Sequence, residues 1–140
     1  MIKYTTSLDQ ITEANLEGGF FTGWLNPPSV STHMQILKSS YVVWLAIDTS
    51  SNEVVGFVNA ISDGVLSAYI PLIEVLPKNQ NQGIGKELMK QMLESLKHLY
   101  MIDLLCDTEL KSYYTKLGMC EATGMLVRNY DHQSVISLHS

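Results

Sequence analysis

Apolar residues recur at two spacings along the chain, and each spacing predicts one kind of element. Three runs rich in β-branched and aromatic residues, separated by turn-forming segments, predict an antiparallel meander of strands over residues 41–48, 53–61 and 65–76. Further along, apolar positions repeat every three or four residues, which predicts an amphipathic helix lying on a sheet. These positions are Ile84, Leu88, Met89, Met92, Leu93 and Leu96.

Shorter elements surround this centre. Before it we expect a strand at residues 2–5, a helix over 7–19, an apolar connection over 20–28, and a second helix from Ser29 or Ser31 to about 39–40. After it we expect a short buried parallel strand over 100–106, a helix over 109–117, and edge strands over 119–128 and 130–138. The chain therefore predicts one α/β (α+β) domain over 1–140, with a mixed, mostly antiparallel sheet of about six to seven strands flanked by about four helices.

Composition narrows the classes of function. Nine basic and fourteen acidic residues give a net charge of −5, which disfavours nucleic acid as a partner. Apolar stretches such as 42–47 are far shorter than the roughly 20 residues that span a bilayer, and the first residues carry no secretory h-region. Two cysteines form neither a zinc pattern nor a disulfide framework. We expect a soluble cytoplasmic protein without a membrane partner, either monomer or homodimer.

The segment 78–86, KNQNQGIGK, joins an apolar strand to the amphipathic helix. A strand that turns through glycine into a helix aims backbone N–H groups and a positive dipole end at one point, which suits a phosphate. A P-loop requires Ser or Thr after the lysine, but Glu87 follows Lys86. A dinucleotide fingerprint requires a third glycine or alanine where this chain has Leu88.

Three motifs resemble one family. Gln80-x-x-Gly83-x-Gly85 resembles the Gln/Arg-x-x-Gly-x-Gly/Ala signature of the GCN5-related N-acetyltransferases, which bind acetyl-coenzyme A. The segment 113–119, YYTKLGM, resembles the family's aromatic-Tyr-x-x-x-Gly-Phe, and 75–77, VLP, resembles its Val-x-Pro. The predicted order of elements also resembles the family architecture. Together these features cover residues 41–119, whereas the first forty residues carry no motif of the family.

The resemblance implies an acetyl-CoA-dependent N-acetyltransferase that acts by direct attack of a primary amine, on a small-molecule or peptide acceptor and without a metal. Backbone N–H groups of 82–86 would hold the pyrophosphate, and glycines there would let the phosphates approach the backbone. The pantetheine arm would run beside the preceding strand, where the amide of Val75 or Leu76 would stabilise the oxyanion. The expected cofactor contacts are Val75, Leu76, Gln80, Gln82, Gly83, Ile84, Gly85, Lys86 and, where many relatives carry asparagine, Asp107.

Two residues are candidates for catalysis. By its place in the motif, Tyr114 would protonate the departing thiolate, with Tyr113 in the core; the alternative is a core tyrosine with a satisfied hydroxyl. Glu74 is the one acidic residue in the 65–76 strand, and near the site its pKa could rise enough to accept a proton from the amine. The alternative for Glu74 is a solvent-facing position. Cys106 is interpreted as a small buried hydrophobe rather than an acetyl-cysteine nucleophile.

The acceptor side is the least determined part. We assign Phe20, Phe21, Trp24 and Asp63 to the substrate wall, with core packing as the competing interpretation for the aromatic residues. The four histidines are scattered and predict no metal site. Two other functions stay open: a catalytically inactive acyl-CoA sensor that keeps the glycine loop, and a structural domain in which the glycine turn is fortuitous.

Overall fold

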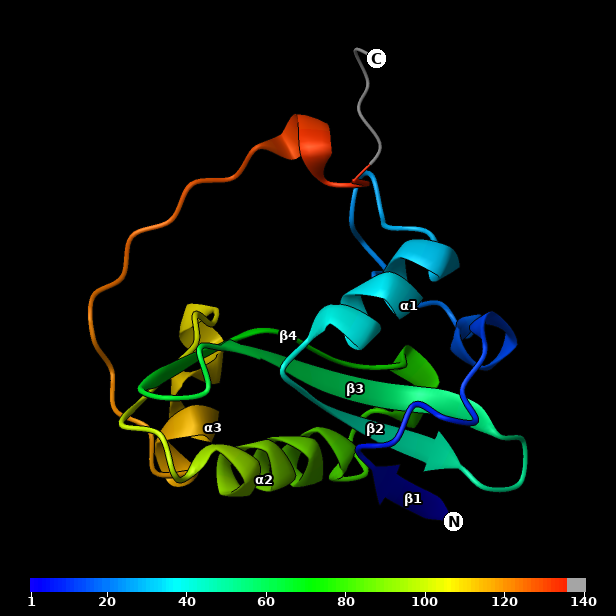
Figure 1. The fold of residues 1–140 in the computed structure, drawn as a ribbon, viewed down its shortest axis with the longest axis horizontal. Coiled ribbons are helices and arrows are strands. Elements are labelled where there is room, and N and C mark those ends of the chain that lie inside the picture. Colours follow the sequence, from blue (N-terminus) through cyan, green and yellow to red (C-terminus); the bar gives the residue numbers. More distant parts are fainter. Residues whose placement is uncertain (136–140) are drawn as a thin grey trace.

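One five-stranded sheet forms the centre of the protein, whose structure, a computed structural model, describes residues 1–135 (Figure 1). The strands lie in the order of the sequence, and their bounds are β1 Ile2–Thr5, β2 Val42–Asp48, β3 Glu53–Ser62, β4 Ser67–Val75 and β5 Met101–Asp103. β1 to β4 pair antiparallel, whereas β5 pairs parallel to β4. The predicted antiparallel meander and the parallel crossover through a helix are both confirmed.

Helices cover the two faces of the sheet. α1, Val30–Ser39, lies on one face and begins at Ser29, whose hydroxyl accepts from the Thr32 amide. α2, Ile84–Leu96, lies on the other, and its apolar stripe joins the core residues of β2, β3 and β4. α3, Lys111–Lys116, adds Tyr114 to that second core. The remaining helical turns are the short 3-10 segments η1 Glu13–Leu16, η2 Pro77–Asn79, η3 Thr108–Leu110 and η4 Tyr130–His132.

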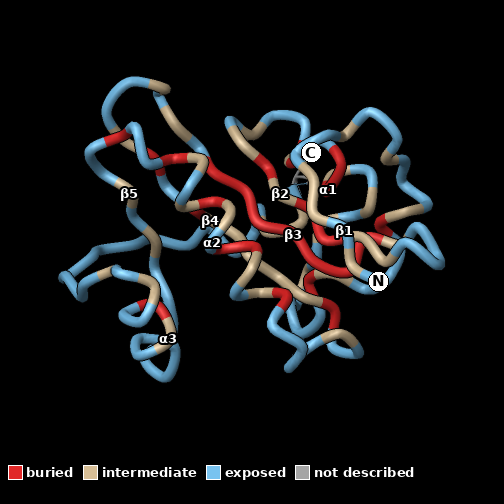
Figure 2. Tube along the Cα trace, turned by 90° about the horizontal axis from the view of Figure 1, so that it is seen from below, coloured by how far each residue is buried: buried red, intermediate tan, exposed pale blue. Residues whose placement is uncertain are grey.

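Because strand side chains alternate between faces, the sheet separates two apolar cores. The core under α1 contains Leu45, Phe57 and Leu37, and the core over α2 contains Val58, Leu88 and Met92. Figure 2 shows that the buried positions follow the central strands and α2, while β5, α3 and the chain after them are largely exposed. The end of β4 and the glycine loop that follows it are less buried than β3.

Three predicted elements are wrong near the chain ends. The predicted helix 7–19 is reduced to η1, because hydroxyls of Thr5 and Ser7 accept from amides two residues on and favour turns. The predicted edge strand 119–128 is extended but belongs to no sheet, and 130–135 contains η4 instead of a strand; residues 136–138 lie outside the described range. The described sheet thus has five strands instead of six to seven, with three α-helices instead of four.

The strand predicted over 100–106 is also shorter and less buried than expected. β5 has three residues, of which Met101 and Asp103 are exposed. It pairs only with the first three residues of β4, from Ser67 to Tyr69. The remaining two thirds of β4 therefore has a partner on the β3 side and an open edge on the other.

Candidate active site

The open edge of β4 has a local cause. Pairing between β3 and β4 shifts register between Asn59 and Ile61, where β4 has one more residue than β3, and Pro71 lies in this interval. Proline has no N–H to offer to a ladder and is found in strands at edges and bulges. A bulge bends the strand that carries it, so β4 separates from β5 after Tyr69. The separation exposes the backbone of Leu72–Val75 just before the glycine loop.

The glycine loop presents a row of amides with no acceptor from the protein. Within the described residues, no hydrogen bond is assigned to the N–H groups of residues 82–86, since the first helical bond of α2 is donated by Glu87 to Gly83 at 3.1 Å. Gly83 precedes α2 with a φ of 81°, a conformation that glycine adopts without steric cost. Free amides at the start of a helix favour an anion; that this loop binds one stays a prediction.

Alternation along β4 decides which strand amides are available. The N–H of Leu76 donates to the Val55 carbonyl at 2.8 Å, so Leu76 is directed toward β3 and cannot serve as an oxyanion donor. Because backbone groups alternate in direction along a strand, the amide of Val75 faces the open edge. The carbonyl of Val75 accepts from Gln80 Nε2 at 3.1 Å, which fixes the loop against the strand. Of the two predicted donors, the structure leaves Val75.

A cavity of about 390 Å³ joins the strand end to the loop. Asn79 lines it, and the Oδ1 atom of this residue is buried without a partner among the described residues. This acceptor was missed by sequence reasoning, because an asparagine in a turn carries no signal that separates turn formation from ligand binding. The lining residues are Ile73, Glu74, Val75, Asn79, Gln80, Asn81, Gly83, Ile84, Gly85, Lys86 and Tyr113.

Glu74 is half-buried at the end of β4 and is held by one backbone amide. Its Oε1 accepts from the N–H of Phe21 at 2.9 Å, while Oε2 is buried and unpartnered among the described residues. Burial raises the pKa of this carboxyl above its usual value, and the bond from Phe21 partly opposes the rise. Phe21 has a φ of 65°, uncommon for a residue with a side chain. The structure thus brings together a predicted base and a predicted wall residue.

Aromatic rings surround the Phe21 end of Glu74. Glu74 lies directly opposite Phe57 on β3, so both side chains project to the α1 face of the sheet. The rings of Phe20 and Phe21 pack edge-on against Phe57 and His33 at centroid distances of 5.0–6.2 Å. Trp24 lies outside them, 5.0 Å from Phe21. The apolar connection therefore packs on the core and lies beside the carboxylate. Its assignment to the substrate wall stays a prediction.

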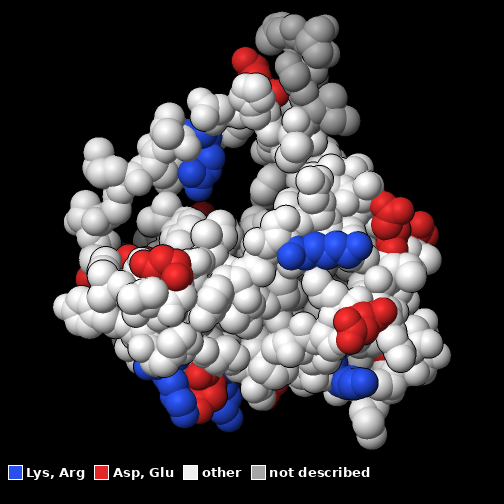
Figure 3. Space-filling view, viewed as in Figure 1, with Lys and Arg blue, Asp and Glu red and all other residues white. Residues whose placement is uncertain are grey.

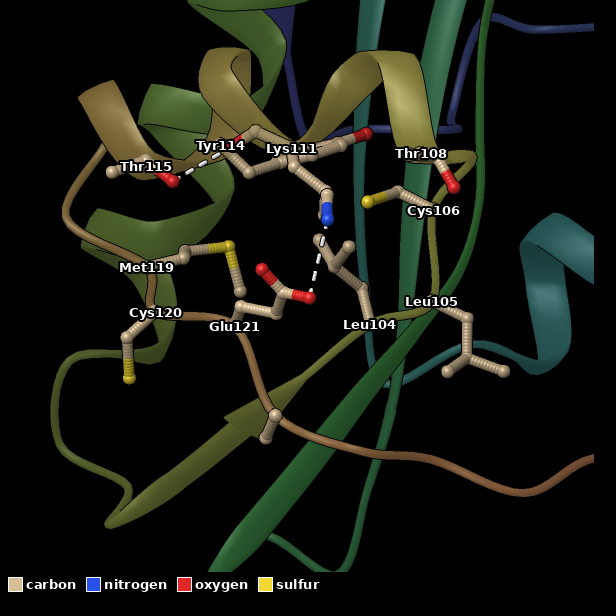
Figure 4. A pocket seen from close by; sticks show the side chains of 11 residues that line it. Leu104, Leu105, Cys106, Thr108, Lys111, Tyr114, Thr115, Met119, Cys120 and Glu121 are labelled. Carbon is tan, nitrogen blue, oxygen red and sulfur yellow. Dashed lines mark hydrogen bonds and ion pairs between the residues drawn. The ribbon is translucent and has the colours of Figure 1, made fainter.

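The two tyrosines of α3 lie at different cavities. Tyr113 lines the glycine-loop cavity, whereas Tyr114 is only 8% exposed and lines a cavity of about 270 Å³ together with Cys106, Lys111 and Met119 (Figure 4). Burial raises the pKa of both phenols, to about 12 for Tyr113, and the nearby Cys106 adds to the rise for Tyr114. Both phenols are protonated at neutral pH, as unshifted tyrosines are, and the rise makes each a weaker acid than an exposed tyrosine.

Comparison with known proteins identifies the family to which this site belongs. Residues 10–119 match the sequence profile of the acetyltransferase (GNAT) family. The chain belongs to this family. Uncharacterised N-acetyltransferase ycf52 of the red alga Porphyra purpurea is 31% identical over 99 residues, covering 69% of this chain and 57% of that protein. The chain thus spans little more than half the length of the curated relatives that it matches.

Solved structures agree with the assignment. A crystal structure of a proposed acetyltransferase from Deinococcus radiodurans R1 superposes with a TM-score of 0.90 at 44% sequence identity, covering 95% of this chain and 92% of that one. A GNAT family protein from Streptococcus pneumoniae TIGR4 superposes with a TM-score of 0.70 at 29% identity, covering 92% and 97%. The similarity to the Deinococcus structure extends over almost the whole GNAT chain described above.

The remaining predicted site residues of this GNAT chain lie apart from Glu74. Asp63 is fully exposed, and its carboxylate accepts from the amides of Val65, Leu66 and Ser67, which lowers its pKa and closes the β3–β4 turn at the opposite end of β4. Asp107 is exposed at the N-terminal end of η3, and its side chain makes no cap there. Cys106 is exposed as well, so the expected burial of this thiol is wrong.

Charged side chains, metal-binding groups and long apolar helices are the features of the described residues that bear on the class of partner. The face shown in Figure 3 carries scattered acidic and basic side chains with no continuous basic patch. Residues 1–135 contain no group of three or more His, Cys, Asp or Glu placed to hold a metal ion. No described helix has the length and apolar character needed to cross a membrane.

Proposed function

We propose that this GNAT chain transfers an acetyl group from acetyl-CoA to a primary amine by direct attack. The observation that carries the proposal is the line formed by free amides at the start of α2, the open backbone edge of β4, and a half-buried carboxylate with an unpartnered oxygen at the strand end. The free amides suit the phosphates of the acetyl donor, and the open edge of β4 suits an extended chain that contains amides. The carboxylate suits the amine of the acceptor.

The residues before α2 would hold the donor. Amides of residues 82–86 bind the pyrophosphate, assisted by the dipole of α2. Outward backbone groups of β4 pair with the pantetheine amides as an added strand would. Asn79 Oδ1, which is buried and has no partner among the described residues, accepts from an N–H of acetyl-CoA. The Val75 amide, at the same edge, stabilises the oxyanion that develops on the thioester carbonyl.

Glu74 is the proposed base. Its raised pKa makes the carboxylate a stronger proton acceptor than an exposed glutamate, and its free Oε2 is the atom positioned to receive an amine proton, directly or through water. The bond from Phe21 fixes the other oxygen and with it the orientation of the carboxylate. The amine nitrogen then attacks the carbonyl carbon, the C–S bond breaks, and the amine proton passes to Glu74.

Tyr114 is the proposed acid, which returns a proton to the departing thiolate. Its place in the tyrosine motif supports this role. Burial raises the pKa of the phenol above its usual value, so Tyr114 carries its proton at neutral pH, as an ordinary tyrosine does, but is a weaker acid than an exposed one. Tyr113 is the natural control, since it is adjacent on α3, has a ring centroid 5.0 Å away, and lines the glycine-loop cavity instead. Two unpaired, exposed cysteines support a reducing cytoplasmic setting as part of this proposal.

The test is release of free coenzyme A from acetyl-CoA across a panel of primary amines, with calorimetry of coenzyme A binding alongside. Wild type should turn over and bind. Tyr114→Phe should lower turnover at saturating acetyl-CoA with little change in binding, whereas Tyr113→Phe should retain turnover. The reverse pattern moves the acid to Tyr113. Glu74→Gln should lose the acidic limb of the pH–rate profile; an unchanged limb removes Glu74 as base.

Two further outcomes separate the competing functions. If coenzyme A binds but no amine of the panel causes its release from acetyl-CoA, an acyl-CoA sensor is favoured. If coenzyme A does not bind at all, both the acetyltransferase and the sensor are refuted. An acetylated protein detected by mass spectrometry after incubation with acetyl-CoA alone would contradict direct attack, and Cys106, exposed beside Tyr114, is the residue that would then carry the group.

A further inference from the structure

A small cavity lies between the apolar connection 20–28 and the first turn of α1. Its volume is about 100 Å³, and Phe20, Phe21, Val30 and His33 are among the residues that line it. It shares no lining residue with the cavity at the glycine loop. Because the share of one water molecule in the liquid is about 30 Å³, a cavity of this size admits a group of a few heavy atoms.

His33 is a buried polar side chain on the wall of this cavity. It is 2% exposed, its Nε2 atom is buried without a partner, and no hydrogen bond is assigned to either ring nitrogen among the described residues. The rings of Phe20, Phe21 and Phe57 surround it at centroid distances of 4.5–5.2 Å. A polar group that leaves water without finding a partner costs free energy, and a ligand group that reaches the imidazole would remove this cost.

The imidazole of His33 favours a hydroxyl as its partner. Burial lowers the pKa of His33 to about 4, so the ring is uncharged at neutral pH and carries one N–H and one lone pair. A hydroxyl both donates and accepts, so it pairs with this ring in either tautomer, whereas a carboxylate requires the N–H and an ammonium requires the lone pair. The apolar wall also disfavours an ion, because the one charged lining residue, Glu17, is exposed and repels an anion.

Phe21 joins this cavity to Glu74. Its amide donates to Glu74 Oε1 at 2.9 Å, and its ring lines the cavity with its centroid 5.0 Å from that of His33. Phe57 contacts both sides as well, since it lies opposite Glu74 in the β3–β4 pairing and its ring centroid is 4.5 Å from that of His33. The carboxylate and the cavity therefore lie on the same face of the sheet, separated by one residue.

We propose that the acceptor is an amino alcohol, a primary amine joined by a short chain to a hydroxyl, and that His33 binds this hydroxyl in the cavity. The inference rests on the proposed function, because it places the reacting amine at Glu74. His33 then determines specificity through a part of the substrate away from the reacting atoms. An alkylamine of the same length brings a methyl group to the imidazole instead and leaves it unpaired, so the amino alcohol is selected.

The kinetic test measures release of coenzyme A from acetyl-CoA with matched amines: ethanolamine against propylamine, and longer amino alcohols against alkylamines of equal length. For at least one pair, kcat/KM of wild type should favour the amino alcohol at least about tenfold. His33→Phe keeps an aromatic ring without nitrogens, so it should lose this preference while its kcat/KM for the alkylamine is unchanged. No preference in wild type, or a preference that survives His33→Phe, overturns the proposal. So does a stronger preference for the amino acid of equal length, beginning with glycine.

Nuclear magnetic resonance of the His33 ring nitrogens in wild type measures binding without turnover. The preferred amino alcohol should shift these resonances to saturation, and the matched alkylamine should not. Saturable shifts without release of coenzyme A refute acetyl transfer and support a hydroxyl site at His33. Release of coenzyme A without such shifts refutes the hydroxyl site and leaves acetyl transfer standing, so the two failures are distinguishable.

Discussion

A substitution at Gly85 should affect coenzyme A binding and folding stability in opposite directions. Gly85 is the second residue of α2, and a Cβ built there lies 3.6 Å from Val75 Cγ2 and 3.9 Å from Tyr113 Oη, which are ordinary van der Waals contacts. Gly85→Ala is therefore accommodated without displacing any neighbour. Because alanine reduces the conformational freedom of the unfolded chain, we expect the free energy of unfolding to rise by about 0.4–1 kcal/mol.

The same methyl group would weaken cofactor binding. Val75 and Tyr113 both line the glycine-loop cavity, so the added Cβ points into the space proposed for the pyrophosphate. Holding phosphate oxygens away from the amides of the loop should raise the dissociation constant of coenzyme A at least about tenfold, which corresponds to roughly 1.4 kcal/mol. We therefore expect Gly85→Ala to have a higher free energy of unfolding than wild type and a lower affinity for coenzyme A.

Chemical denaturation and isothermal titration with coenzyme A measure the two effects on the same preparation. Gly83→Ala is the matched control: nothing lies within 4 Å of its added Cβ, but its φ of 81° makes alanine strained, so stability should fall by roughly 1–2 kcal/mol. If Gly85→Ala binds coenzyme A as wild type does, the phosphates do not lie on this loop, and the proposed donor site is wrong.

Two further predictions concern pH. His33 is 2% exposed among aromatic rings, and burial lowers its pKa from 6.5 to about 4. Between pH 6.5 and pH 4 the unfolded protein therefore binds more protons at His33 than the folded protein does. Over this range wild type should lose roughly 3 kcal/mol of unfolding free energy relative to His33→Phe. Equal slopes for the two proteins in urea titrations would contradict this. For Glu74 the sign is opposite, because a folded-state pKa raised above 4.5 lowers stability at neutral pH. Glu74→Gln should be at least as stable as wild type at pH 7, and the difference in unfolding free energy should shrink toward pH 4.5. A difference that grows on acidification would refute this.

Local signals in the sequence were enough for the centre of the fold. β-branched runs between turns predicted β2, β3 and β4 to within two residues at each end, and the three-to-four spacing predicted α2 from Ile84. The glycine loop was found for the same reason, because strand, glycine turn and helix start are consecutive in the chain. Features that depend on neighbours in sequence are readable from it.

Elements at the margins depended on contacts that the sequence does not show. The predicted helix 7–19 is reduced to η1 because side-chain hydroxyls accept hydrogen bonds from the amides that a helix would use. The 119–128 segment alternates as a strand does, but a strand forms only against a partner, and none of the described edges receives it. One overlooked signal was present: Pro71 inside an apolar strand indicates a bulge or an edge.

The sequence by itself determined the family, the position of the glycine loop and the choice of the two candidate catalytic residues, because motif and spacing carry them. Only the tertiary structure decided what surrounds those residues. It directed Leu76 toward β3 and left Val75 at the open edge, set the Phe21 amide on Glu74 across 53 positions of sequence, and moved Tyr113 to the glycine loop. The physical reason is that hydrogen-bond direction, burial and pKa are properties of the packed environment, which long-range contacts create.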